Sequence, residues 1–184
     1  YGAPREVKRI PNYICPEAAV LPLTNDMEAL KGRITEMKAR GNTYGSTGMV
    51  WGYRMITPDF PFQEAVPYEN TGYRKVVVMM TDGNNCSQWT DCAYGRTGET
   101  TVDTNGESDD RLEDTCANMD TQDNITIYTS TCEASSGGIS QATKDLYEAC
   151  AVNGGRHEHV TSSEELIQVF RDIAQELSNL RIRS

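Results

Sequence analysis

The carboxylate of Asp82 stands where a strand is expected to end, a position at which a side chain could bind a ligand. Five consecutive apolar residues, 76–80, precede it, and Thr81-Asp82-Gly83 closes the run. The run has the length of a strand, and its lack of alternation favours a strand buried on both faces of a parallel sheet. Ligands bind at the carboxyl ends of the strands in open α/β sheets. Asp82 is therefore a candidate binding residue, with a simple strand-ending turn as the alternative.

A second group of oxygen-bearing side chains lies in the polar segment 83–110. Its members are Asp103, Asn105, Glu107, Asp109 and Asp110. They could bind Ca²⁺, but their spacing is not that of an EF-hand loop, so a solvated acidic loop is the alternative. A connection of this length is long for a compact domain, and such loops often carry function.

The two histidines of the chain, His157 and His159, are separated by one residue. On a strand both would point to the same face. We interpret them as surface side chains of an edge strand, and no Ser-His-Asp or Cys-His constellation can be assembled from them. Trp51 and Tyr53 are interpreted as packing residues rather than as a binding platform. The sequence thus predicts that the chain is not an enzyme.

The net charge of the chain limits the kinds of partner that it can bind. A formal net charge of −10 and a pI of about 4.7 argue against nucleic acid, because phosphate binding requires clustered Lys and Arg. No apolar stretch approaches the length of a membrane span, and no signal peptide is visible. We expect Tyr1 not to be the start of the gene product, and a targeting segment to have been removed if the protein is exported.

Six cysteines are spread along the chain. An even number of widely spaced cysteines favours disulfides and an oxidising compartment over a metal site, since only two histidines are present. At least two disulfides are expected, and the sequence does not choose among the pairings. Cys86 with Cys92 is the local candidate, because it would clip a polar loop. The six are Cys15, Cys86, Cys92, Cys116, Cys132 and Cys150.

Helical and strand-like patterns alternate along the chain, which predicts an α/β fold with helices packed on a mostly parallel sheet. One domain is expected over residues 1–184, with 1–16 as an irregular lead-in and 18–23 as at best an edge strand. Residues 41–48 are expected to form a small-residue loop before an apolar segment at 49–56. The predicted helices run from an Asn25 N-cap to Gly41, near 109–121, over 139–151 and from a Ser162–Glu165 capping box onward, and the strands cover 75–80, 125–129 and 156–160.

Three blocks of the sequence together resemble the von Willebrand factor type A domain, in the version found in TadG-like proteins of bacterial tight-adherence (Flp) pilus systems. They are GNTYGSTGMVWGYRMITP at 41–58, KVVVMMTDGNN at 75–85, and a tail with the strand at 125–129, Cys150-Ala151 and SSEELIQVFRDIAQELSNLRI at 162–182. The resemblance covers roughly residues 17–183. It implies a doubly wound, Rossmann-like, mostly parallel sheet flanked by helices, and a WG-containing helix after the G-x-T loop.

The resemblance also implies a cation site above the sheet, with Thr43 and Asp82 as ligands. Hydroxyl and carboxylate oxygens suit Mg²⁺ or another hard divalent cation. The family's Asp-x-Ser-x-Ser motif is absent, so the chain looks like the C-terminal part of such a domain, without its first strand. With only two of the ligands present, we expect weak or undetectable Mg²⁺ binding by this chain alone.

From this resemblance we expect a non-enzymatic protein-binding or assembly module of the bacterial cell envelope, in the periplasm or secreted, acting in pilus assembly or adhesion. A partner carboxylate would complete the coordination of the cation. The partners are expected to be envelope or pilus proteins, or a missing N-terminal part of the same domain, with membrane contact only through a missing N-terminal segment. The alternative function is a metal-assisted hydrolase that uses Asp82 and the acidic loop.

The apolar strand at 76–80 is expected to have one hydrogen-bonding neighbour in this chain, the strand at 125–129. A buried strand normally has a neighbour on both sides. An open flank exposes backbone groups and invites association. We therefore expect the flank to be filled by a segment from outside these residues, by residues 1–24 or by a second copy of the chain.

Overall fold

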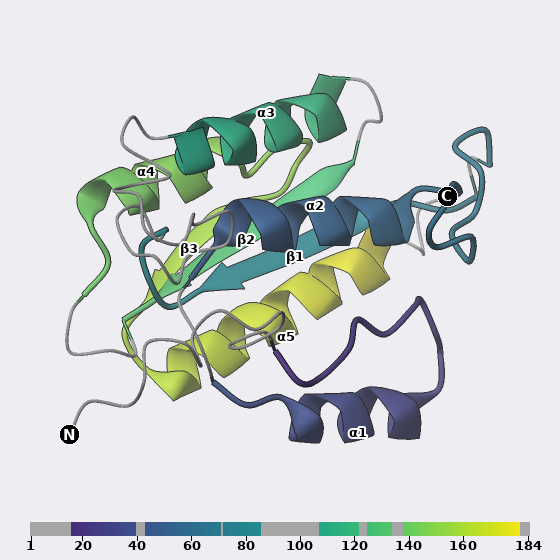
Figure 1. Cartoon of the computed structure of the whole chain (residues 1–184), viewed down its shortest axis with the longest axis horizontal. Helices are drawn as coiled ribbons and strands as arrows, with labels where there is room; N and C mark the ends of the chain where they lie inside the picture. Colours follow the sequence, from purple (N-terminus) through teal and green to yellow (C-terminus); the bar gives the residue numbers. More distant parts are fainter. Residues whose placement is uncertain are drawn as a thin grey trace, which may run out of the picture. The chain divides into compact units, whose positions relative to one another are not determined.

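The computed structural model describes residues 16–39, 43–70, 72–85, 107–121, 125–133 and 138–180 (Figure 1). The chain divides into two compact units. One comprises Tyr1–Tyr73 with Asn85–Arg111, and the other Arg74–Asn84 with Leu112–Ser184. The fold of each unit is described separately, and the expectation of a single domain over residues 1–184 stays a prediction.

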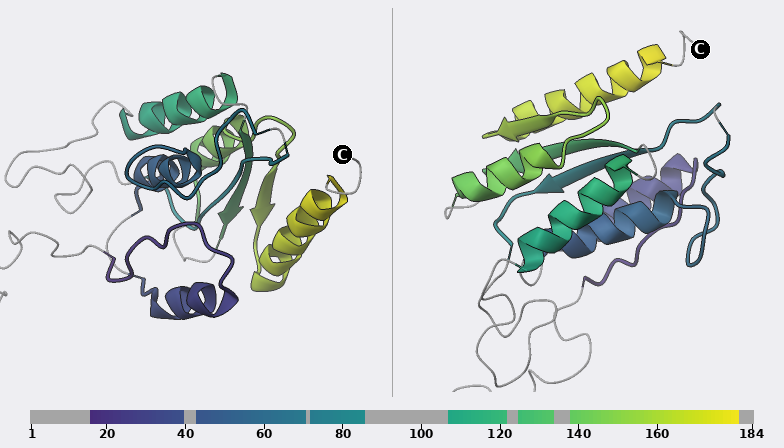
Figure 2. Two further views of the ribbon diagram at one scale, coloured as in Figure 1. Left: turned by 90° about the vertical axis from the view of Figure 1, so that its right-hand side faces the viewer. Right: turned by 90° about the horizontal axis from the view of Figure 1, so that it is seen from above.

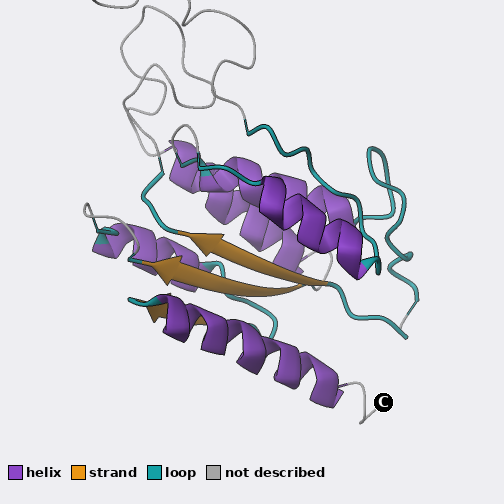
Figure 3. Ribbon diagram, turned by 90° about the horizontal axis from the view of Figure 1, so that it is seen from below, coloured by secondary structure: helices purple, strands orange, loops and turns teal. Residues whose placement is uncertain are grey.

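The second unit is an α/β structure built on a three-stranded parallel sheet. Strands β1 (Val76–Thr81), β2 (Thr126–Cys132) and β3 (His157–Val160) lie side by side in the order β1-β2-β3 (Figure 3). Parallel neighbours require a crossover, and helices supply it here. The three strands predicted at 75–80, 125–129 and 156–160 thus all exist, within one to three residues of their expected bounds, and the arrangement is compatible with a Rossmann-like fold.

Helices cover both faces of this sheet (Figure 2). Helix α4 (Gln141–Ala149) lies on the face to which Thr129 points, since the Thr129 hydroxyl reaches the Tyr147 carbonyl. Helix α5 (Ser163–Leu180) lies on the opposite face, where Glu176 contacts Arg156 near the Tyr128 ring. Consecutive strand residues point to opposite faces of a sheet, so the contacts of Tyr128 and Thr129 place α5 and α4 on opposite faces.

The strand buried throughout is β2, not β1, which corrects the expectation drawn from the apolar run. β1 is an edge strand, and its Val78 and Met80 side chains are 38% and 47% exposed. Every residue of β2 is buried, although four of its seven are Thr or Ser. Position decides burial here, because β2 has strand neighbours on both sides and helices over both faces. Within the described part of the chain β1 pairs with β2 alone, as the sequence predicted for this strand.

Helix α3 (Glu107–Thr121) is divided between the two units, and residues 112–121 belong to the second unit. Leu112 and Met119 of this segment are fully buried, as are Ile125 and Ile127 at the start of β2. Fully burying one such side chain stabilises the fold by roughly 1.5–3 kcal/mol. These apolar side chains form the core of the unit beside the polar interior of β2.

The first unit contains α1 (Met27–Glu36) and α2 (Gly45–Ile56). The N-cap of α1 is Asp26 rather than the predicted Asn25, because Asp26 Oδ1 accepts hydrogen bonds from the amides of residues 28 and 29. The helix ends at Glu36, short of Gly41. The expected edge strand at 18–23 has no strand structure.

Helix α2 begins inside the segment 41–48 that was predicted to be a loop. The amide of Gly45 donates to Asn85 Oδ1 at 2.7 Å, across forty residues of sequence. A distant amide side chain thus satisfies one of the backbone donors that a helix N-terminus leaves open. No helix in the described residues is long and apolar enough to cross a membrane.

Candidate functional site

Asp82 lies at the carboxyl end of β1, as the sequence predicted, although this strand is at the edge of the sheet. The preceding Thr81 is buried and its hydroxyl fixes the turn. Thr81 Oγ1 donates to the Gly83 carbonyl at 2.9 Å and accepts from the Gly83 amide at 3.3 Å. A turn closed by its own hydroxyl leaves the Asp82 side chain exposed at a defined place.

The turn is also anchored to the N-terminus of α4. Asn84 Oδ1 accepts from the Ser140 amide and from Thr143 Oγ1, both at 2.8 Å. Ser140 is itself the N-cap of α4, and its hydroxyl accepts from the Thr143 amide at 3.1 Å. The polar groups of Asn84, Ser140 and Thr143 thus hold one another. They position the turn, and Asp82 is the carboxylate that this turn presents.

Thr43, the second predicted ligand, belongs to the first unit, where it lies half-buried two residues before α2. At the start of α2, Asn85 donates to Asp109 Oδ1 at 2.7 Å, and Arg111 donates to the Tyr44 hydroxyl at 2.9 Å. The approach of Thr43 to Asp82 stays a prediction, since the two residues belong to different units.

The predicted acidic loop is in part helical. Asp109 and Asp110 lie on α3, which begins at Glu107. Asp103 and Asn105 lie outside the described residues, so the Ca²⁺ hypothesis is not tested. In the part of the chain that the structure describes, no three His, Cys, Asp or Glu side chains are arranged to hold a metal ion. The role of Asp82 as a cation ligand stays a prediction.

The histidines lie on β3, an edge strand of the described sheet, and His159 is exposed there, as predicted, whereas His157 is half-buried and is more than a surface side chain. His157 Nδ1 lies 2.9 Å from Thr129 Oγ1, and its Nε2 lies 3.3 Å from Thr131 Oγ1. His159 Nδ1 lies 2.9 Å from the same Thr131 oxygen. Both rings therefore point to one face, as predicted, but they are bonded to buried hydroxyls of β2. The signal that sequence reasoning missed is the matching i, i+2 spacing of Thr129 and Thr131.

Burial lowers the pKa of His157 below its ordinary value, because desolvation disfavours the charged ring. The charge of Glu148 opposes this shift of the pKa, as does that of Glu158, while His159 and Lys144 reinforce it. Since the largest influence is burial within the fold, the direction of the shift depends on the packing of this strand.

Arg156, which the sequence analysis did not single out, joins β3 to α5. Its guanidinium forms ion pairs with Glu158, at 2.9 Å, and with Glu176, and it lies 5.7 Å from the centre of the Tyr128 ring. Burial and the hydrogen bond to Glu176 raise the pKa of Tyr128. This cluster fixes α5 on its face of the sheet.

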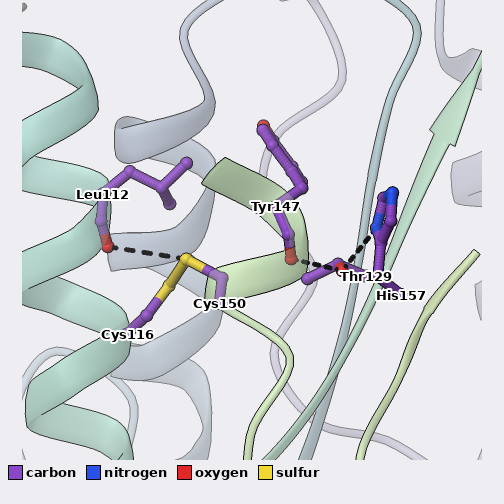
Figure 4. The surroundings of a disulfide bond; sticks show 6 residues. All are labelled: Leu112, Cys116, Thr129, Tyr147, Cys150 and His157. Carbon is purple, nitrogen blue, oxygen red and sulfur yellow. Dashed lines mark hydrogen bonds between the residues drawn. A yellow bond between two sulfur atoms is a disulfide. The ribbon is translucent and has the colours of Figure 1, made fainter. Parts of the chain in front are cut away.

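One disulfide is present among the described cysteines, between Cys116 of α3 and Cys150 at the end of α4 (Figure 4). Cys150 Sγ also lies 3.9 Å from the Leu112 carbonyl. Cys132 is a buried free thiol. Cys15, Cys86 and Cys92 lie outside the described residues, so the Cys86–Cys92 pairing and a second disulfide stay predictions.

The two aromatic residues of α2 fit the packing interpretation in part. The Trp51 ring meets Phe62 edge to face, with 6.1 Å between ring centres, and Arg54 lies 6.0 Å from the Trp51 ring. Trp51 is nevertheless 41% exposed. Tyr53 is half-buried.

Comparisons of this chain with protein-family models, with curated proteins and with solved structures give no match.

Proposed function

We propose that this chain is a non-enzymatic protein-binding or assembly module of the bacterial cell envelope, of the von Willebrand factor type A kind and similar to the TadG-like proteins of tight-adherence pilus systems. The sequence blocks at 41–58, 75–85 and 162–182 support the proposal by their order. The observation that carries it is the exposed Asp82 carboxylate, held on a fixed turn at the carboxyl end of a parallel strand.

A rigid carboxylate at this edge suits contact with a partner through a hard cation. Asp82 would supply a carboxylate oxygen and Thr43 a hydroxyl oxygen, and a carboxylate of the partner protein would complete the coordination. The hydrogen bonds of Thr81 and Asn84 hold the turn before any partner arrives, which limits the entropy lost on binding. With two ligands from this chain, the affinity for the cation alone is expected to be low.

The disulfide supports a place in the cell envelope or outside the cell. Structural disulfides form and persist in oxidising compartments. The Cys116–Cys150 bond lies in the core of its unit, with both residues almost fully buried. This bond and the sequence resemblance support the proposal that the protein lies in the periplasm or is secreted.

The test locates a cation directly, with Mn²⁺ as a paramagnetic probe and the ¹⁵N-labelled chain. Mn²⁺ at millimolar concentration is expected to broaden the amide signals of residues 81–84 and of Thr43. The Asp82→Asn variant should lose this broadening, because it keeps the side-chain size and removes the charge. Asp172→Asn on the exposed face of α5 is the matched control for a change of net charge. It should behave like the unchanged protein.

Two results would overturn the proposal. Broadening that avoids residues 81–84 and is unaffected by Asp82→Asn would remove the cation from this edge. Hydrolysis of p-nitrophenyl phosphate or p-nitrophenyl acetate with Mn²⁺, lost in Asp82→Asn, would establish the hydrolase alternative instead.

A further inference from the structure

The face of the sheet under α4 carries a continuous chain of hydrogen bonds between β2 and β3. It begins at the Tyr147 carbonyl, which accepts from Thr129 Oγ1 at 2.7 Å (Figure 4). From Thr129 it passes to His157, then to Thr131 and then to His159. The four side chains lie on the paired segments of the two strands, where Thr129 is opposite His157 and Thr131 is opposite His159.

Counting protons along this chain fixes the state of His157. A Thr hydroxyl has one proton to donate. Thr129 gives its proton to the Tyr147 carbonyl, so it can only accept from His157, and the Nδ1 atom of His157 must carry a proton. A neutral His157 then has a bare Nε2, which accepts the proton of the Thr131 hydroxyl.

The count continues to His159. Because Thr131 has used its proton on His157, its oxygen must accept from Nδ1 of His159. His159 Nε2 lies 3.3 Å from Glu133 Oε1, and Lys144 Nζ lies 3.1 Å from the same oxygen.

A second proton on His157 breaks this order. Its Nε2 then becomes a donor aimed at Thr131, whose own proton loses its acceptor. Thr131 Oγ1 would then stand between two N–H groups of adjacent rings. A hydroxyl proton without an acceptor is costly here, because Thr131 is fully buried. β3 has four residues, so it has few other bonds to the sheet.

We propose that Thr129, His157, Thr131 and His159 form an acid-operated latch, which holds β3 and the helix after it on the sheet while His157 is neutral and releases them when it gains a second ring proton. The inference is independent of the cation site at Asp82. The charged groups around His157 are Glu148 and Lys144 of α4, with Glu158 and His159 of β3.

The direction of the pH effect follows from burial. The pKa of His157 is lowered from 6.5 in the folded chain, so the unfolded or open form binds the proton more readily. The stability of the latch is fully present above about pH 6.5 and is lost as the pH falls through the folded pKa. The pKa values of Glu133 and Glu165 are lowered from 4.5, so these carboxylates lose their contribution at more acidic pH.

The first measurement is the tautomer of His157, from long-range ¹H–¹⁵N NMR of the full chain at pH 7.5. The expected neutral form carries its proton on Nδ1. A neutral form protonated on Nε2 would contradict the proton count and overturn the proposal.

The second measurement is amide hydrogen exchange, corrected for the intrinsic rate, between pH 7.5 and 5.5. The Thr129 amide donates to the carbonyl of Arg156, just before β3, and the Glu133 amide donates to the carbonyl of Val160 in β3. Exchange of these two amides therefore reports the release of β3. The amide of Thr126 donates to Lys75 beside β1 and is the internal control. Protection at Thr129 and Glu133 should fall by about tenfold for each unit by which the pKa is lowered, with Thr126 unchanged.

Variants test whether His157 causes the pH dependence of amide protection. His157→Phe keeps an aromatic ring at this half-buried position and should abolish the pH dependence, whereas His159→Gln should retain it. If His157→Phe does not fold, Thr129→Val takes its place. Without the Thr129 hydroxyl, the neutral His157 ring should no longer be restricted to the form with its proton on Nδ1. An equal loss of protection at Thr126, or the same pH dependence in the His157 variant, would refute the latch.

Discussion

Removing the disulfide should cost a large part of the stability of the second unit. The bond joins Cys116 to Cys150 across a sequence separation of 34, and its Cα atoms are 5.3 Å apart. For a loop of this length, constraint of the unfolded chain is worth about 3–4 kcal/mol. Domains of this size are stable by only about 5–15 kcal/mol, so the double variant Cys116→Ala, Cys150→Ala should be strongly destabilised.

Urea unfolding followed by circular dichroism measures this loss. With a slope of about 2 kcal/mol per molar, the midpoint should fall by roughly 1.5–2 M. Cys132→Ala is the matched control, because it removes a buried thiol that forms no disulfide. It should lose about 1 kcal/mol, from packing alone. A double variant within about 1 kcal/mol of the parent, or no more destabilised than Cys132→Ala, would refute the reasoning.

Three further outcomes are expected. Ile127→Ala, at a fully buried position of β2, should lose about 2–5 kcal/mol in the same urea assay, whereas Val78→Ala at the exposed edge should lose less than about 1 kcal/mol. Thiol titration of the denatured, unreduced chain should find at most two free thiols out of six, and six free thiols would exclude the disulfide-bonded reading. Calorimetric titration should detect weak or no Mg²⁺ binding, and tight binding abolished by Asp82→Ala would mean that other residues complete the site.

The elements with strong local patterns were predictable from the sequence. The apolar run at 76–80 and the capping box of Ser162 and Glu165 depend on neighbours along the chain, so β1 and α5 appear where they were expected. The place of Asp82 at a strand end follows from the same run. Its strand is an edge strand for a reason that lies outside the run, since the order of strands depends on pairing between distant segments.

Other features depend on partners far away in sequence. The start of α2 depends on Asn85, and a pattern of small residues near 45 reads equally well as a loop. β2 was recognised as a strand, but its burial was not, because Thr129 and Thr131 look like surface residues until the histidines opposite them are known. Apolar periodicity does not reveal a buried strand made of polar residues, because it takes hydrophobic residues as the sign of burial.

The disulfide has a mechanical consequence for a chain that is pulled by its ends. Force that enters at Cys116 passes through the sulfur atoms to Cys150 and bypasses everything between them, including the whole of β2. The bypassed segment would add about 115 Å of length if it could be drawn out straight. The oxidised chain cannot release that length, so stretching leaves the central strand without tension. In a stretching experiment, reduction of this bond should lengthen the final extension by about this amount.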